Sequence, residues 1–261
     1  MQLGKAIAAV VTGGGSGLGA ATARALAARG VKVAVFDLNE PEGKRIAKEI
    51  GGHFWKCDVA SEGSADAALA AARSAHGQER ILVNCAGIAA GKRTARRVKE
   101  TGAIEPHDLA SFAKCVEVNL IGTFNMIAKC AAGMMATKPL DADGERGVII
   151  NTSSVAAEDG QLGQVAYAAS KGGVLALTLP VARDLAREGI RVATILPGLF
   201  ETPMFNALSD EARQALAAQV PFPSRLGSPA EYAMLAVHIC ENSMLNSCAI
   251  RLDGAIRLAP R

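Results

Sequence analysis

Short apolar runs alternate with longer helical stretches along all 261 residues, and this alternation limits the fold more than any other feature. The runs that we expect to form strands cover residues 7–12, 31–36, 53–57, 81–84, 148–152, 191–196 and 249–252. Nearly all are continuously apolar, as in strands that are buried on both faces. The pattern predicts an α/β fold with one doubly wound, mostly parallel sheet of about seven strands and helices on both faces.

Helical segments follow these runs in turn. We expect helices at residues 16–29, 41–50, 61–76, 108–136, 165–188, 210–220 and 229–241. The regular alternation makes the arrangement Rossmann-like. The basic residues 91–106 and the segment 198–229 are expected to be mainly irregular. Because neither a repeat nor a boundary divides the chain, we expect one domain over residues 1–261.

Composition excludes several classes of protein. Half of the residues are hydrophobic and 20% are charged, which is too apolar for a disordered chain. The net charge of +3 does not suggest a nucleic-acid partner. The six scattered cysteines form no C-x-x-C pair, and the four histidines have no ligand-like spacing. No apolar run has the length of a signal peptide or a membrane span, so we expect a cytoplasmic protein without metal or membrane contact.

A glycine-rich loop, T-G-G-G-S-G-L-G at residues 12–19, joins the first expected strand to the first helix. Glycine lets the backbone turn tightly and approach a pyrophosphate, and the helix N-terminus offers N–H groups to the phosphates. A plain tight turn is the alternative, but the position between strand and helix favours a nucleotide. We expect contacts from Gly13, Ser16, Gly17, Leu18 and Gly19.

Asp37 ends the second expected strand, 18 residues after Gly19. A carboxylate there can accept hydrogen bonds from both hydroxyls of an adenine ribose and would repel a 2′-phosphate. The next residues, Leu38-Asn39-Glu40, include no cation. The sequence therefore favours NAD over NADP, with a solvated acid at a strand end as the alternative.

Tyr167 and Lys171 are four residues apart on an expected helix and share one face of it, although a plain surface pair is the alternative. Ser154 follows the strand at 148–152, where a doubly wound sheet forms its ligand crevice. A nearby ammonium and a positively charged nicotinamide favour a phenolate. Tyr167 could then exchange a proton with a substrate oxygen that Ser154 also hydrogen-bonds, while Lys171 holds the nicotinamide ribose.

With these motifs the chain resembles the short-chain dehydrogenase/reductase family over essentially its whole length. The resemblance includes Asp58-Val59, the N-C-A-G run at residues 84–87, Asn119 and Pro197-Gly198; Cys85 stands where the family usually has asparagine. It implies that Asn119 kinks its helix and anchors a water linked to Lys171. It also implies cofactor contacts or support from Asp58, Val59, Asn84, Ala86, Gly87, Pro197, Gly198, Leu199 and Thr202.

Residues 147–203, 219–232 and 250–257 resemble one branch of that family more closely. Members of the branch oxidise (3S)-3-hydroxyacyl-CoA and 2-methyl-3-hydroxyacyl-CoA with NAD, accept some steroid alcohols and are homotetramers. We expect the same reaction, in fatty-acid or branched-chain acyl-CoA breakdown. A hydroxysteroid or other secondary-alcohol dehydrogenase is the alternative. A non-catalytic dinucleotide-binding scaffold is a further one, against which the intact serine, tyrosine and lysine argue.

The sequence gives fewer indications of which residues bind the substrate. The resemblance places Gln161 beside the substrate carbonyl, and it shows departures at Glu201 and Ser247-Cys248. Residues 198–229 suit a mobile lid over an apolar pocket, although core packing is the alternative for part of its side chains. That lid would use Leu199, Phe200, Met204, Phe205, Leu208 and Leu216, of which Phe200 and Leu208 are expected to touch substrate. A cluster of cations in residues 91–106 suits the phosphates of CoA, or is simply solvated: Lys92, Arg93, Arg96, Arg97 and Lys99.

Overall fold

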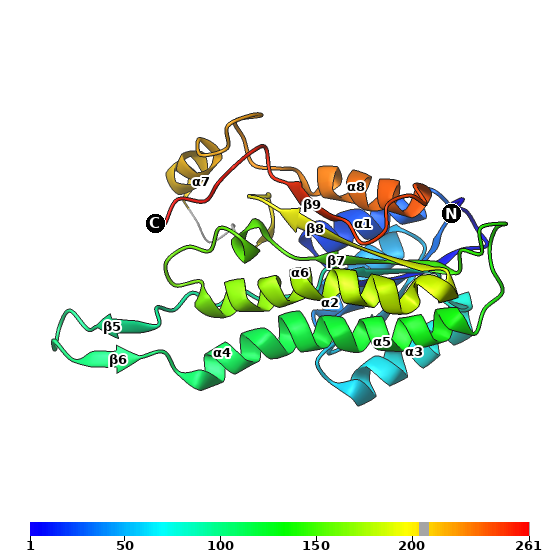
Figure 1. Ribbon diagram of the computed structural model, residues 1–261, viewed down its shortest axis with the longest axis horizontal. Helices are drawn as coiled ribbons and strands as arrows, with labels where there is room; N and C mark the ends of the chain where they lie inside the picture. Colours follow the sequence, from blue (N-terminus) through cyan, green and yellow to red (C-terminus); the bar gives the residue numbers. More distant parts are fainter. Residues whose placement is uncertain (204–208, 261) are drawn as a thin grey trace.

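A computed structural model describes residues 1–203 and 209–260, and within them seven parallel strands form one sheet (Figure 1). The strands are β1 (Ala8–Thr12), β2 (Lys32–Asp37), β3 (His53–Lys56), β4 (Ile81–Asn84), β7 (Gly147–Thr152), β8 (Ile190–Pro197) and β9 (Ala249–Leu252). Their order across the sheet is β3-β2-β1-β4-β7-β8-β9. The predicted fold class is confirmed, and each predicted strand is present.

Helices cover both faces of the sheet. One face carries α1 (Gly17–Ala27), α2 (Glu40–Glu49) and α8 (Pro229–Glu241). The other carries α3 (Glu62–His76), α5 (Gly122–Met135) and α6 (Val165–Leu185), while α4 (Leu109–Val116) packs on α6. Successive strand residues serve opposite cores: Val10 and Ile149 face the second set of helices, whereas Val11 and Ile150 face the first. Both faces are therefore apolar, which explains why the strands do not alternate.

Capping residues begin several helices where the sequence indicates. The hydroxyl of Ser61 accepts a hydrogen bond from the Ser64 amide and starts α3, as predicted. Ser228 and Glu231 form a capping box at the start of α8. Between α4 and α5, residues Glu117–Ile121 form a π-helical turn, so the predicted helix 108–136 continues through a local distortion.

The basic segment 91–106 is not the irregular loop that we expected. It contains an antiparallel hairpin of β5 (Ala95–Arg97) and β6 (Ile104–Pro106), which projects from the body of the molecule (Figure 1). Arg96 faces Glu105 across the two strands, and their side chains are 2.8 Å apart. The sequence did not indicate these strands because they are short and exposed, and so lack an apolar face.

The helical stretch Val165–Glu188 is long and apolar enough to cross a membrane, judged by length and composition alone. A core helix of a soluble protein passes the same test. Here Ser170, Lys171 and Val174 are buried, and the helix packs on β8. One such helix is weak evidence for a membrane span.

Ser247 has a φ angle of 59°, in the left-handed region that favours glycine. Its amide donates to the carbonyl of Val192 at 2.7 Å, and the carbonyl of Cys248 accepts from Thr194 at 2.9 Å. The turn before β9 therefore uses a left-handed residue other than glycine.

Candidate active site

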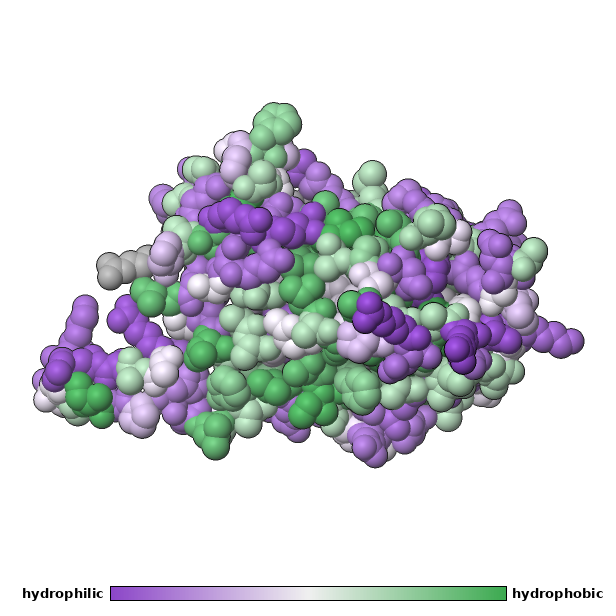
Figure 2. Space-filling view, viewed as in Figure 1, coloured by the Kyte–Doolittle hydropathy of each residue, from purple (hydrophilic) through white to green (hydrophobic). Residues whose placement is uncertain are grey.

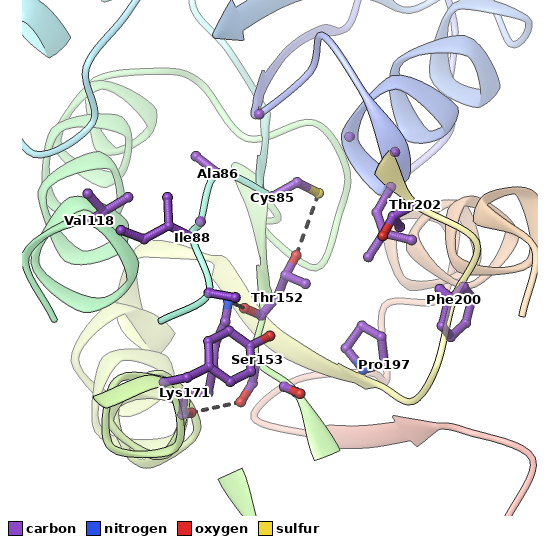
Figure 3. A pocket seen from close by; sticks show the side chains of 18 of the residues that line it. Cys85, Ala86, Ile88, Val118, Thr152, Ser153, Lys171, Pro197, Phe200 and Thr202 are labelled. Atoms are coloured by element: carbon purple, nitrogen blue, oxygen red, sulfur yellow. Dashed lines mark hydrogen bonds between the residues drawn. The ribbon is translucent and has the colours of Figure 1, made fainter. Parts of the chain in front are cut away.

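The carboxyl ends of the central strands open onto a cleft of about 820 Å³ (Figure 3). Its walls come from the glycine loop, the end of β2, the residues after β4 and β7, the helix α6 and the segment after β8. Parallel strands that point their carboxyl ends at one edge create such a crevice. The topology thus gathers the predicted motifs in one place.

The glycine loop depends on residues without side chains. Gly13 and Gly17 have φ angles of 61° and 49°. A Cβ on Gly19 would lie 2.2 Å from the carbonyl oxygen of Gly13, so α1 can start this close to the loop only with glycine. The loop therefore keeps its backbone open toward the cleft, as a phosphate-binding turn requires.

Asp37 is held firmly at the edge of the cleft. Its Oδ2 accepts from the amide of Gly15, and its Oδ1 accepts from the amide of Asn39, both at 2.8 Å. Each carboxylate oxygen can accept further hydrogen bonds. The acid is thus oriented and still has acceptor capacity for hydroxyl groups of a ligand.

Two hydrogen bonds fasten α6 to the end of β7. The ammonium of Lys171 donates to the carbonyl of Thr152 at 2.7 Å, and the Ser153 hydroxyl donates to the carbonyl of Lys171 at 2.7 Å (Figure 3). The Lys171 nitrogen lies 5.8 Å from the centre of the Tyr167 ring. Ser154 starts the next turn, with its Oγ accepting from the Ala156 amide at 3.1 Å. Serine, tyrosine and lysine therefore meet at one wall of the cleft.

Burial shifts the pKa values of both titratable groups on α6. It raises the pKa of the Tyr167 phenol, and a hydrogen bond with Ser154 offsets part of that rise. Burial also lowers the pKa of Lys171 from 10.5 to about 8, while Cys85 and Cys115 act in the opposite sense. In the chain alone, burial therefore works against a phenolate, which the sequence prediction attributed to the Lys171 ammonium together with a bound nicotinamide.

Asn119 lies in the π-helical turn, where the resemblance implied a kinked helix. Its Oδ1 accepts from the Ile88 amide at 2.8 Å, and its Nδ2 donates to the Ile88 carbonyl at 2.9 Å. The Nδ2 also lies 3.0 Å from the Ser170 hydroxyl. A Cβ on Gly87 would stand 3.1 Å from Asn119 Oδ1 and 3.5 Å from Lys171 Nζ, so glycine keeps the space between them open.

The structure brings most of the predicted site residues together. Those that line the cleft are Gly13, Ser16, Gly17, Leu18, Gly19, Asp37, Asp58, Val59, Ala86, Gly87, Ser154, Gln161, Tyr167, Lys171, Pro197, Gly198, Leu199, Phe200 and Thr202. Asn84 stands behind the wall, buried, with its amide donating to Asn151 Oδ1 at 3.0 Å. Met204, Phe205 and Leu208 lie outside the described residues.

Sequence reasoning missed the contribution of the chain end. Leu258 lines the cleft, and the carbonyl of Ala259 accepts a hydrogen bond from the Gln161 side chain at 2.8 Å. Gln161 therefore lines the cleft, but its side-chain amide is hydrogen-bonded to the C-terminal tail. No local pattern could have indicated this, because the contact joins positions 98 residues apart.

Cys85 lines the cleft without reactive character. Its sulfur lies 3.5 Å from the Thr152 hydroxyl (Figure 3) and, outside that view, 3.7 Å from the Tyr232 hydroxyl. Burial raises the pKa of the thiol. Among residues 1–203 and 209–260, no three His, Cys, Asp or Glu side chains are grouped to hold a metal ion. The chemistry at hand is proton transfer by hydroxyl groups and an amine.

Comparisons with known proteins agree with this geometry. The short chain dehydrogenase family matches residues 7–213. The 3-hydroxyacyl-CoA dehydrogenase type-2 of Bos taurus is 52% identical over 258 residues, which cover 98% of this chain and 97% of that protein. Its Homo sapiens counterpart is 50% identical over the same shares. The crystal structure of 3-hydroxyacyl-CoA dehydrogenase type-2 from Mycobacterium avium matches with a TM-score of 0.92 and 41% identity over 98% of both chains. The resemblance inferred from the sequence is confirmed.

The lowered pKa of Lys171 predicts how the free energy of unfolding changes with pH. Between about pH 8 and 10.5 the unfolded chain binds more protons than the folded one, so the wild-type free energy of unfolding rises with pH in that window. Lys171→Met should remove this rise. Near neutral pH it should stabilise the fold by up to about 3 kcal/mol, less the lost hydrogen bond to Thr152.

Urea denaturation of the wild type and of Lys171→Met at a series of pH values measures the difference between their free energies of unfolding. The advantage of Lys171→Met should shrink as the pH approaches 10.5. Lys5→Met makes the same replacement at an exposed lysine and serves as the control. A difference between wild type and Lys171→Met that stays constant over the window would contradict the prediction.

Proposed function

The chain belongs to the short-chain dehydrogenase family and is an oxidoreductase, and on that premise we propose that it oxidises (3S)-3-hydroxyacyl-CoA to 3-oxoacyl-CoA with NAD. One observation carries the substrate class: the chain is about half identical, over nearly its full length, to proteins named 3-hydroxyacyl-CoA dehydrogenase type-2. The convergence of Ser154, Tyr167 and Lys171 supports the reaction type. The reaction would serve fatty-acid or branched-chain acyl-CoA breakdown.

The residues of the cleft fit a nicotinamide dinucleotide. The open backbone of residues 13–19 would hold the pyrophosphate, and Asp37 would accept from the adenine ribose. Asp58 and Val59 would contact the adenine, and Pro197, Gly198, Leu199 and Thr202 would border the nicotinamide; all six line the cleft. Because the Asp37 carboxylate is fixed in place and repels a 2′-phosphate, we favour NAD over NADP. Bound NAD would accept a hydride from the alcohol carbon.

Side chains of the cleft would transfer the proton. Ser154 hydrogen-bonds the substrate oxygen, and Tyr167 takes the hydroxyl proton as the alcohol becomes a carbonyl. Its raised pKa makes the phenol a poor base in the free chain, so the positive charges of Lys171 and of the bound nicotinamide are both needed. Lys171 would also bind the nicotinamide ribose. Asn119 would hold a water that links Lys171 to solvent.

A secondary-alcohol or hydroxysteroid dehydrogenase is the second candidate. Apolar side chains line the cleft beside the catalytic wall, among them Ile88, Val155, Leu199 and Phe200. Such a lining also suits a bulky alcohol without CoA. Residues 198–229 would act as the lid in either case.

We propose a homotetramer in the cytoplasm. Apolar side chains on the outer surface of the helical layer support self-association, because large exposed apolar patches mark interfaces. Ile121 and Phe124 are 53% and 52% exposed, and Leu179 on α6 is 43% exposed. Figure 2 shows apolar residues gathered on the face that α4, α5 and α6 form in Figure 1. The six free cysteines suit a reducing compartment.

The assay that tests this function follows NADH oxidation with acetoacetyl-CoA as substrate. We expect rapid turnover with NADH and little with NADPH. A steroid ketone under the same conditions separates the two candidates. If the steroid reacts with a higher kcat/KM than every acyl-CoA, the acyl-CoA assignment is wrong while the dehydrogenase site stands.

Replacing the catalytic tyrosine tests the proton-transfer role. Tyr167→Phe removes only the hydroxyl, so turnover should fall by roughly 10²–10⁴-fold while NADH binding is kept. The chain has one other tyrosine, Tyr232, whose hydroxyl lies 2.7 Å from that of Thr152 in the core. Tyr232→Phe is the matched control and should lower stability by about 1 kcal/mol with kcat unchanged. Substantial activity in Tyr167→Phe would refute the assignment.

The basic hairpin offers positive charge beside the mouth of the cleft. Ala90 and Gly91, just before it, line the cleft, and the hairpin extends outward from there (Figure 1). Lys92 and Arg96 are paired with Asp108 and Glu105. Arg93 and Arg97 are exposed, and Arg97 donates to the carbonyl of Gly102. We propose that these two arginines attract the phosphates of CoA.

Charge reversal tests this role without breaking the cross-strand pair. Arg93→Glu with Arg97→Glu should raise KM for acetoacetyl-CoA by roughly 10-fold, equivalent to about 1.4 kcal/mol. Neither kcat nor KM for a CoA-free ketone should change. Arg183→Glu with Arg187→Glu makes the same charge change at exposed positions near the far end of α6. An equal change in KM for the CoA ester and for the free ketone would contradict the proposal.

A further inference from the structure

The C-terminal tail folds back across the substrate side of the cleft. After β9 the chain turns at Gly254 and Ala255, whose φ angles are 61° and 67°. It then runs beside the loop of residues 158–164, where the amide of Leu162 donates to the carbonyl of Pro260 at 3.1 Å. The side chain of Gln161 donates to the carbonyl of Ala259 at 2.8 Å. The tail is thus hydrogen-bonded to the loop that precedes the catalytic helix.

An ion-pair network anchors the start of the tail. Arg251 on β9 lies 2.8 Å from Asp159 and 2.8 Å from Asp253, and it donates to the carbonyl of Ile256 at 2.9 Å. Arg257 reaches the same Asp159 at 3.3 Å. Because Arg251 is only 19% exposed, this network is better protected from solvent than an ordinary surface pair. The backbone of residues 256–260 is therefore held at both ends.

Between these anchors, Leu258 is the tail residue that lines the cleft. It is half-buried, whereas its neighbours Arg257, Ala259 and Pro260 are exposed. Gln161 and Gln164, from the adjoining loop, line the same wall. One apolar side chain is therefore presented to the cleft by an otherwise exposed segment.

The same loop also contacts the base of the basic hairpin. The amide of Lys92 donates to the carbonyl of Gly163 at 2.7 Å. Hairpin base, loop and tail thus form one continuous rim, which we call the substrate rim: residues 89–92, 158–164 and 256–260. The rim adjoins the start of α6, which carries Tyr167, whereas the glycine loop and Asp37 line the cleft from β1, α1 and β2. On the proposed function, a ligand group near the rim belongs to the substrate rather than to the dinucleotide.

We propose that the C-terminal tail selects the acyl chain of the substrate, with Leu258 as the contact and Gln161 as the positioning residue that holds the tail. The proposal rests on the acyl-CoA function above. An isobutyl side chain suits an alkyl group better than the polar amides of pantetheine, because burying an amide without a partner costs free energy. Leu258 would then limit the length and branching of the acyl group beyond its 3-oxo carbon.

Two opposite substitutions test the contact. A series of 3-oxoacyl-CoA esters of increasing chain length, with one 2-methyl ester, gives the ratio of kcat/KM for long or branched substrates to that for the shortest. Leu258→Ala should raise this ratio by roughly 10-fold, because extra methylene groups find room. Leu258→Trp should lower it. Leu140→Ala makes the same truncation in the loop between α5 and β7, away from the residues that line the cleft, at a side chain that is 38% exposed, and should leave the ratio unchanged.

Gln161→Ala separates positioning from catalysis. If Gln161 holds the tail, its loss should shift the chain-length ratio in the same direction as Leu258→Ala, with the kcat for the shortest ester kept. If it instead contacts the substrate carbonyl, kcat should fall for every ester and the ratio should stay. The second result would overturn the positioning role.

The outcomes also separate this proposal from the function on which it rests. If wild type reduces no 3-oxoacyl-CoA, the proposed function fails, and the same ratio is measured with CoA-free 3-oxo esters of increasing length. If Leu258→Ala changes KM for all CoA esters equally and leaves CoA-free esters unaffected, the tail faces CoA and the proposal is wrong. A uniform loss of kcat/KM at every chain length would likewise show a purely structural tail.

Discussion

The reciprocal attachment of α6 to the end of β7 is the constraint on which the site depends. Lys171 donates to the Thr152 carbonyl while its own carbonyl accepts from Ser153, so one residue is bonded through both its side chain and its backbone. This attachment sets the distance between Tyr167 and the strand end that carries Ser154. It also confines an ammonium group in a buried place, where its pKa falls to about 8. The protein thus gives up stability near neutral pH to keep a positive charge beside the phenol.

Much of the fold and of the cofactor half of the cleft could be predicted, because the signals are local. Strands buried on both faces have to be continuously apolar, and a helix whose first turn packs against Gly13 needs glycine at position 19. Asp37 could be placed at the edge of the cleft because the end of a strand fixes where its side chain lies relative to the loop. In each case a few neighbouring residues determine the geometry, and the parallel topology then brings the separate motifs to one edge.

The substrate half could not be predicted in the same way. The role of Gln161 depends on Ala259, and Leu258 reaches the cleft only because an ion-pair network around Arg251 turns the tail back. The hairpin strands are stabilised by cross-strand pairs such as Arg96 and Glu105 rather than by an apolar face, so hydrophobic periodicity does not reveal them. Asn84 donates its side-chain amide to Asn151 and so joins β4 to β7 behind the wall, a supporting place that only the family resemblance indicated.

This difference between the two halves has a consequence for how the site can vary. The cofactor half is made from segments whose backbone is nearly fixed by glycine contacts, and most changes there would disturb the loop itself. The substrate rim is joined by main-chain hydrogen bonds from Lys92 to Gly163 and from Leu162 to Pro260, and by the side chains of Asp159, Gln161 and Arg257. A rim side chain outside that set, such as Leu258, can therefore change without moving Tyr167 or Lys171. On the proposed function, substrate preference would then diverge at the tail while hydride transfer and proton transfer stay the same.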